Sequence, residues 1–243
     1  MESLEKLLSR VIPPRNLEYQ GEPQGDICPV CKGNSFVQRH VQYGHPDWGK
    51  IFPCGCQSGG ADQVGPSFEN FTCHPNYHDV QLAYEATQNW SQGRGPAILV
   101  LNGPRGVGKT HLARAALRAI IQADAHASVR WMPDGELSDT IRNSYETDSW
   151  NEWKFEFKGC QWLIIDDLGS ITLSDHMRSR YGEIIDWRWQ GAGNGPPIRT
   201  MVTTNAAPDI LGSRVESRLL DVSRTRAVTI EAPDYRLTGD TQA

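Results

Sequence analysis

The sequence predicts an α/β protein in which a parallel sheet is covered by helices on both faces. From Pro66 onward, short apolar runs alternate with amphipathic segments of helical period, which is the pattern of repeated strand–helix units. Before that point, residues 12–66 are rich in Gly, Pro, Gln and Cys and show little periodicity. That composition indicates a small metal-stabilised module and not a self-sufficient core. We therefore expect two domains, at residues 1–65 and 66–243.

Apolar runs are expected to form a five-stranded sheet, and the segments between them its covering helices. The expected strands are residues 97–101, 127–132, 161–165, 199–203 and 227–231. Helices are expected at residues 111–121, 135–145 and 174–189, and Asp79 is expected to cap a further helix with Leu82, Ala86 and Trp90 on one face. Residues 1–11 predict a short amphipathic helix that either packs on its own domain or docks on a partner protein.

Composition limits the classes of function. The chain has 243 residues, 22% of them charged, and a net charge of −5, so any DNA contact must use a local basic surface and not bulk charge. The longest aliphatic run has about five residues, far short of the ~20 that span a bilayer. The N-terminus carries acidic residues and lacks a signal-peptide core, so we expect a cytoplasmic protein without a membrane partner.

The segment Gly103–Thr110 has the pattern G-x-x-x-x-G-K-T of a phosphate-binding loop, set between an apolar strand and a helix. Its glycines let backbone N–H groups surround phosphates, and the dipole of the following helix favours their charge. Lys109 is expected to reach the β- and γ-phosphates of ATP, and the Thr110 hydroxyl to ligate Mg²⁺. The predicted nucleotide-binding residues are Gly103, Pro104, Arg105, Gly106, Val107, Gly108, Lys109, Thr110 and His111.

Two later strands end in polar residues suited to hydrolysis. Asp166 and Asp167 follow the apolar residues 163–165. Asp166 is expected to hold Mg²⁺ with Thr110, and Asp167 to polarise the attacking water. Because Asp167 is shorter than the commoner Glu, we expect less efficient positioning of water. Asn205 ends another apolar strand, from which it could reach the γ-phosphate or the water.

Four cysteines form two close pairs, Cys28-x-x-Cys31 and Cys54-x-Cys56. Two such pairs predict a tetrahedral, structural Zn²⁺ site, and loss of the metal should unfold the module. Because the second pair has one intervening residue, His40 or His45 could replace a thiolate. Unrelated buried or free cysteines remain the alternative.

Together these motifs resemble the DnaC type of AAA+ helicase loaders and their relatives, the IstB transposition ATPases. The resemblance covers nearly the whole chain, including the paired cysteines, which resemble the zinc module of many loaders. The matching segments are Phe68–Phe71 (F-x-N-F), Gly108–Ala113 (G-K-T-H-L-A), Ile164–Gly169 (I-I-D-D-L-G), Ile184–Trp189 (I-I-x-x-R-Y), Thr203–Asn205, Ser217–Leu219 and Tyr235–Arg236.

The resemblance implies a P-loop AAA+ core whose cofactors are ATP and Mg²⁺, with Zn²⁺ in the N-terminal module. Asn205 would be the sensor, and Arg218 would enter the site of a neighbouring subunit as an arginine finger, with Arg214 and Arg188 as weaker interface candidates. The short stretch after Arg218 leaves no room for a full helical lid. Asp167 and Asp234, the latter in place of Ser, depart from the family pattern, and the first argues against fast turnover.

The resemblance further implies an ATP-dependent replicative helicase loader. Its partners would be a hexameric helicase, single-stranded DNA and further copies of itself, joined through ATP-site interfaces. The candidate DNA contacts are Arg142, Lys154 and Lys158, for which the alternative is a solvated face. Trp150 and Trp153 near them could stack on bases, or pack in the core or at an interface.

Two alternatives remain open. An IstB-like transposition helper acting on duplex DNA would share the ATPase motifs. A small-molecule kinase would need an acceptor pocket and lid arginines within one subunit. The inter-subunit arginine motif at Ser217–Leu219 and the short C-terminal stretch disfavour this alternative.

Overall fold

The structure is a computed structural model, and it describes residues 30–31, 36–38, 47, 50–54, 65–73, 75–124, 126–192, 198–205 and 212–235. The helix expected at residues 1–11 lies outside these ranges. Within them, no helix combines the length and the apolar character that a bilayer-spanning segment needs.

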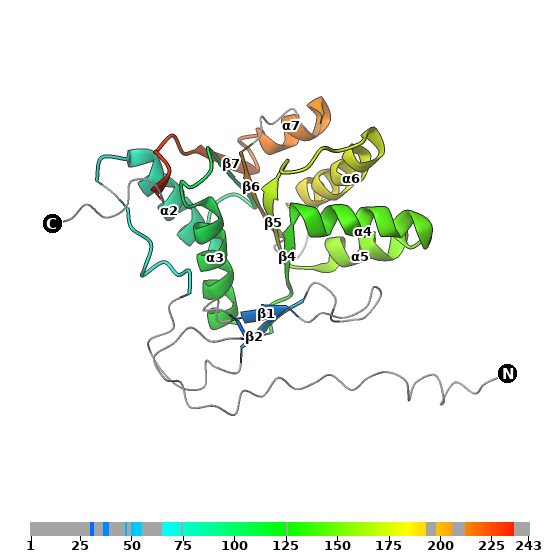
Figure 1. Ribbon diagram of the computed structural model, residues 1–243, viewed down its shortest axis with the longest axis horizontal. Coiled ribbons are helices and arrows are strands. Elements are labelled where there is room, and N and C mark those ends of the chain that lie inside the picture. Colours follow the sequence, from blue (N-terminus) through cyan, green and yellow to red (C-terminus); the bar gives the residue numbers. More distant parts are fainter. Residues whose placement is uncertain are drawn as a thin grey trace.

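The described core is built on one five-stranded sheet, with strand order β4-β5-β6-β3-β7 and every neighbouring pair parallel (Figure 1). The strands are β3 (Ile98–Asn102), β4 (Val129–Pro133), β5 (Trp162–Leu168), β6 (Arg199–Thr204) and β7 (Thr225–Thr229). The predicted five-stranded parallel sheet is therefore confirmed. Because β6 lies between β3 and β5, the carboxyl ends of these three strands, and the polar residues that follow them, lie side by side.

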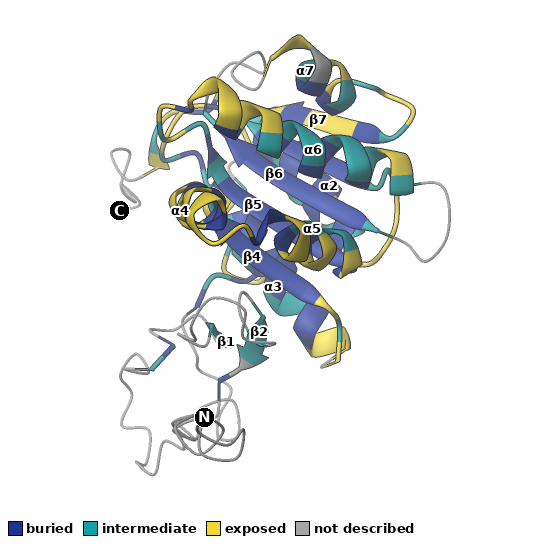
Figure 2. Cartoon of the chain, turned by 90° about the vertical axis from the view of Figure 1, so that its right-hand side faces the viewer, coloured by how far each residue is buried: buried dark blue, intermediate teal, exposed yellow. Residues whose placement is uncertain are grey.

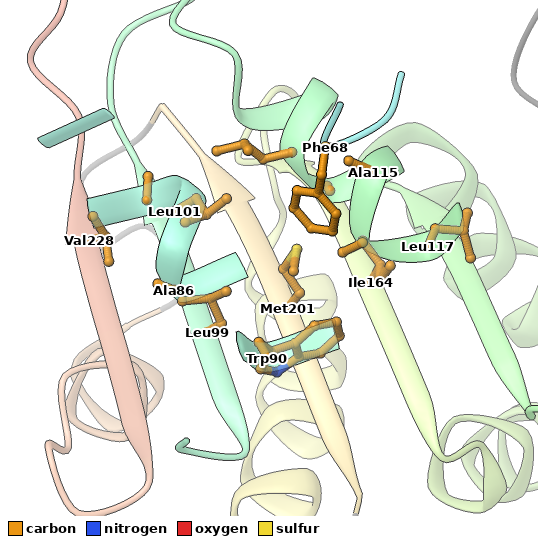
Figure 3. Packing of buried hydrophobic residues seen from close by; sticks show 14 of the residues in the cluster. Phe68, Ala86, Trp90, Leu99, Leu101, Ala115, Leu117, Ile164, Met201 and Val228 are labelled. Carbon is orange, nitrogen blue, oxygen red and sulfur yellow. The ribbon is translucent and has the colours of Figure 1, made fainter. Parts of the chain in front are cut away.

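Helices cover both faces of the sheet. They are α2 (His78–Ser91), α3 (Lys109–Ala123), α4 (Asp134–Glu146), α5 (Trp150–Gly159), α6 (Asp175–Gly191) and α7 (Ser213–Leu219). One core cluster joins α2 and α3 to Leu99, Leu101 and Met201 (Figure 3), and the other joins α4, α5 and α6 to Ile98 and Val100. Successive residues of β3 thus face opposite layers, both of them apolar, which explains its uninterrupted hydrophobic run. Figure 2 shows the buried sheet and the exposed outer sides of α4 and α5.

Helix α5 was not predicted from the sequence. Its only buried side chains are Trp150, Trp153 and Phe157, at a spacing of three and four residues among charged neighbours. This stripe is the minimum that marks a helix face, and it is too sparse to separate a short helix from a loop.

The expected helix cap at Asp79 is wrong. Helix α2 begins one residue earlier, at His78, and its N-cap residue Tyr77 makes no side-chain capping bond. Asp79 lies in the first turn, where Oδ1 accepts a hydrogen bond from the Val80 N–H at 3.0 Å. Oδ2 accepts one from the Glu231 N–H, so Asp79 ties α2 to the segment after β7.

A two-stranded antiparallel hairpin precedes the core. Strands β1 (Phe36–Gln38) and β2 (Ile51–Pro53) pair with Phe36 opposite Pro53. Phe36 and Ile51 are partly buried against the α2–α3 side of the core. The backbone of Lys50 forms an isolated antiparallel β-bridge with Arg130 on the edge strand β4. The hairpin therefore contacts the edge strand β4 (Figure 1). In this position it would shield β4 from pairing with other chains.

Candidate active site

The phosphate-binding loop joins β3 to α3 and requires glycine at two closely packed positions. Gly106 and Gly108 have φ values of +79° and +93°. A Cβ on Gly108 would lie 2.8 Å from Phe71 Cε2, and one on Gly106 would lie 1.8 Å from Asp234 Oδ1. Both the backbone conformation and the packing thus exclude larger residues from the loop.

Lys109 is the first residue of α3 and only 7% exposed. Its Nζ donates hydrogen bonds to the carbonyl oxygens of Gly103 and Pro104, both at 2.7 Å. Burial lowers the pKa of Lys109, while the nearby Asp167 and Asp166 carboxylates act in the opposite direction. The ammonium group is therefore held inside the loop that would surround the phosphates.

Three elements meet at Asp166, near the end of β5. Its Oδ1 accepts hydrogen bonds from Thr110 Oγ1 of α3 at 3.1 Å and from Thr203 Oγ1 of β6 at 2.6 Å. Burial raises the pKa of Asp166 despite these hydrogen bonds. Oδ2 makes no hydrogen bond to any described residue, so a second carboxylate oxygen remains for a metal ion beside Thr110, which fits the predicted magnesium pair.

Asp167 has a left-handed backbone, with φ of +60°. The pairing of β5 with β6 shifts between Ile165 and Leu168, so the strand bulges at the two acids. The Asp167 N–H donates a 2.8 Å hydrogen bond to Thr203 Oγ1, which fixes the bulge. Asp and Asn are the side chains that tolerate this backbone region best, so the geometry gives a physical reason for Asp where Glu is commoner.

Thr203 belongs to the matching segment Thr203–Asn205, but no role was predicted for it from the sequence. It is fully buried, and it binds both acids through one hydroxyl. The available signal was a pair of threonines that directly follows the apolar residues Met201 and Val202. Asn205 follows β6 directly and is half-buried, and its side chain makes no hydrogen bond to a described residue. The neighbouring Thr204 carbonyl accepts from the Gly103 N–H at 3.2 Å, which places the end of β6 beside the phosphate-binding loop.

His111 contacts protein groups. Its Nε2 lies 3.1 Å from both the Ser67 carbonyl oxygen and Asn70 Oδ1. Both are acceptors, so the proton is assigned to Nε2. The Phe71 ring packs edge-on against His111 with centroids 5.1 Å apart. Burial lowers the pKa of His111. His111 therefore fastens residues 65–71 to α3.

Arg188 was expected as an interface candidate, and this is wrong. Its side chain is 1% exposed. Its Nε donates to Thr200 Oγ1 at 2.6 Å, and its terminal nitrogens donate to backbone carbonyls that include Phe157 and Arg199. A guanidinium that satisfies its donors inside the core anchors α6 to the sheet and cannot reach another subunit.

Arg218 lies on α7, and its side chain is 30% exposed. Its Nε donates to Asp186 Oδ1 at 3.1 Å, and its guanidinium carbon lies 3.8 Å from the centroid of the Trp189 ring. Arg236 and the side chain of Arg214 lie outside the described part of the structure.

The candidate DNA contacts have partners within the chain. Arg142 pairs with Asp139 at 3.0 Å, Lys154 pairs with Glu183 at 3.5 Å, and Lys158 lies over the Trp187 ring. Trp150 and Trp153 are buried at 6% and 3% exposure. They therefore pack in the core, and the alternative that they stack on bases is wrong.

Only part of the predicted zinc site is described. Cys31 and Cys54 are both buried. Cys28, Cys56, His40 and His45 lie outside the described residues, among which no cluster of three or more metal-ligating side chains occurs.

Comparisons with known proteins extend this geometry. Residues 65–188 match the family described as the bacterial DnaA ATPase domain. The chain belongs to this family. It is therefore an AAA+ ATPase, and the resemblance drawn from its motifs is confirmed at this level.

Individual relatives are distant. An ATP-binding protein in an insertion sequence of Mycobacterium tuberculosis is 24% identical over 176 residues, 69% of this chain and 66% of the relative. The crystal structure of the DnaC helicase loader aligns with a TM-score of 0.56 at 23% identity, over 68% of this chain and 97% of the loader. AMPPCP-bound DnaA from Aquifex aeolicus aligns with a TM-score of 0.57 at 19% identity, over 69% of this chain and half of DnaA.

Proposed function

We propose that this protein is an ATP-dependent loader of a hexameric replicative helicase that also binds single-stranded DNA. Residues 66–243 would act as the ATPase, and residues 1–65 would dock on the helicase. ATP binding and hydrolysis would switch between assembly and release, through contacts to the γ-phosphate that exist only in the ATP state. The proposal rests most on the ATPase core, whose fold corresponds to 97% of the DnaC loader chain.

Within one subunit, the phosphate-binding loop and Lys109 would bind the phosphates. Thr110 and Asp166 would hold Mg²⁺, which supplies positive charge to the phosphates, and Thr203 keeps the Asp166 carboxylate oriented through its 2.6 Å hydrogen bond. Asp167 would orient the attacking water, with Asn205 beside it.

Arg218 would complete the site of the next subunit. Among described residues its two terminal nitrogens make no hydrogen bond, and the side chain is partly exposed. An arginine fork presented outward in this way suits the negative charge that develops on a transferred phosphoryl group. The proposal therefore includes self-association through ATP-site interfaces.

For the N-terminal module we propose a structural Zn²⁺ held by Cys28, Cys31, Cys54 and Cys56. The hairpin register supports this set. Phe36 pairs with Pro53, so the chain before β1 and the chain after β2, where Cys54 follows directly, leave the hairpin at the same end. Cys31 and Cys54 are both buried, which suits thiolates shared with an ion.

The deciding experiment is co-migration of the purified protein with the hexameric helicase of its host or element, with and without ATP and single-stranded DNA. A defined complex that requires ATP and residues 1–65 supports the loader. A Lys109→Ala variant, which should not bind nucleotide, is the control. Absence of a complex with every candidate helicase, under conditions where the protein hydrolyses ATP, would refute the proposal.

A second candidate is a transposition helper that assembles on duplex DNA. It is favoured by the insertion-sequence relative, which shares 24% identity over 69% of this chain. ATP-dependent assembly on duplex DNA, with no complex with a helicase, would support this candidate over the loader.

A further inference from the structure

Arg218 is held against α6 by two contacts of different kinds. Its Nε donates to Asp186 Oδ1 at 3.1 Å, and its guanidinium lies over the Trp189 ring, with the central carbon 3.8 Å from the ring centroid. A cation at this distance from an indole face is attracted by the electrons of the ring. The hydrogen bond uses Nε, and the two terminal nitrogens make no hydrogen bond within the described residues.

The Trp189 ring that supports Arg218 is itself fixed. Its Nε1 donates to Asp221 Oδ2 at 3.1 Å, and its carbonyl oxygen accepts from Arg224 Nη1 at 2.7 Å. The Arg224 guanidinium also lies over the ring, at 4.3 Å from the centroid. Both Asp221 and Arg224 belong to the turn between α7 and β7, so Trp189 is held by α6 on one side and by this turn on the other.

The platform is also anchored to the sheet. Arg188, the residue before Trp189, is buried and hydrogen-bonded to Thr200 Oγ1 of β6 at 2.6 Å. Adjacent residues of α6 therefore contact different elements. Arg188 fixes α6 to the strand that carries Thr203, and Trp189 presents a flat surface to α7.

We infer that Asp186 and Trp189 are positioning residues, which hold Arg218 in a single orientation for insertion into the ATP site of a second copy of this chain. The inference rests on the proposed function, because it assumes that Arg218 acts in a neighbouring subunit. An arginine without such supports samples many rotamers, and ordering it at the interface would oppose the reaction. Contacts that order the side chain in advance, while leaving the terminal nitrogens for the phosphate, remove that cost.

The test measures ATP turnover per subunit against protein concentration, with Mg²⁺ and single-stranded DNA, together with the affinity of each variant for a fluorescent ATP analogue. Arg218→Ala should lower the concentration-dependent turnover about 10³-fold. Trp189→Leu and Asp186→Ala should each lower it about tenfold, with the analogue bound as tightly as by the unchanged protein. Trp189→Phe keeps an aromatic face and should recover most of the loss.

A matched control and a double-mutant cycle separate positioning from general damage. Trp187 lies on the same helix beneath a different cation, with Lys158 Nζ 4.8 Å from its centroid, so Trp187→Leu should leave turnover nearly unchanged. In an Arg218→Ala background, Trp189→Leu should cause no further loss of turnover. An equal loss from Trp189→Leu in both backgrounds would overturn the positioning role.

Failure of this inference and failure of the proposed function give different results. Normal concentration-dependent turnover in Arg218→Ala would refute the finger itself, and the positioning role with it. A defective Arg218→Ala beside fully active Trp189→Leu and Asp186→Ala variants would refute the positioning role alone.

Discussion

Thr203 donates a 2.6 Å hydrogen bond to Asp166 Oδ1, and the same hydroxyl accepts the Asp167 N–H at 2.8 Å. One buried side chain of β6 therefore sets the carboxylate of the first acid and the backbone of the second. The pairing of β5 with β6 is irregular at this point, so the ladder between these two strands does not fix the two acids on the β6 side. The Thr203 hydroxyl takes over that role.

Thr203→Val tests this arrangement, because it keeps the shape of the side chain and removes the hydroxyl. The Asp166 carboxylate would lose one of its two donors and the Asp167 N–H its acceptor. We expect the free energy of unfolding to fall by about 1–3 kcal/mol, which is the usual cost when a buried polar group loses its partner. We also expect ATP turnover to fall about tenfold. Denaturant unfolding and steady-state kinetics measure the two effects.

Thr204→Val is the matched control. Its hydroxyl donates to the Leu168 carbonyl at 2.7 Å and does not contact either acid. A similar loss of stability with nearly normal turnover is expected. Equal losses of turnover in the two variants would contradict a specific role for Thr203.

Asp167→Asn should separate folding from hydrolysis. The left-handed backbone at φ of +60° accepts Asn as well as Asp, so the variant should fold with almost unchanged stability. Without the carboxylate it should bind ATP and lose most of its turnover. Asp167→Ala should additionally lose stability, by about 1 kcal/mol, because alanine is less suited to this backbone. Retained turnover in Asp167→Asn would exclude Asp167 as the residue that positions water.

The sequence predicted the sheet and the phosphate-binding loop because local patterns specify them. Apolar strands buried on both faces leave continuous hydrophobic runs, and the loop needs glycine at fixed positions. Local patterns do not specify the position of Arg188. Nothing in the local sequence distinguishes an arginine that binds carbonyl oxygens in the core from one that serves an interface, because the difference lies in where β6 and α5 pack. The roles of Thr203 and Trp189 were not predicted for the same reason, since each acts on a residue distant in sequence.

The zinc proposal predicts that Cys31→Ala and Cys54→Ala each abolish stoichiometric binding of Zn²⁺. The purified protein should contain about one Zn²⁺ per chain by elemental analysis. Removal of the metal with a chelator should unfold the N-terminal module and leave binding of the ATP analogue intact. Cys73→Ala is the control, because Cys73 is half-buried against the core and has no close cysteine partner in the sequence. A full complement of zinc in both module variants would show that neither cysteine is a ligand.

The lowered pKa of Glu183 predicts how the stability of the protein depends on pH. Burial alone would raise the pKa of Glu183, but the hydrogen bond from Trp150 Nε1 and the charges of Arg180 and Lys154 outweigh it, so the pKa is lowered. A carboxyl whose pKa is lowered by folding stabilises the protein above its unfolded-state pKa, and that contribution is lost as the pH falls through the folded-state value. Glu183→Gln should therefore lower the free energy of unfolding by about 1 kcal/mol at about pH 7. The difference in unfolding free energy between the two proteins should shrink toward zero below about pH 4. Denaturant unfolding of both proteins across this range measures it, and a difference that stays constant with pH would assign the effect to packing and not to charge.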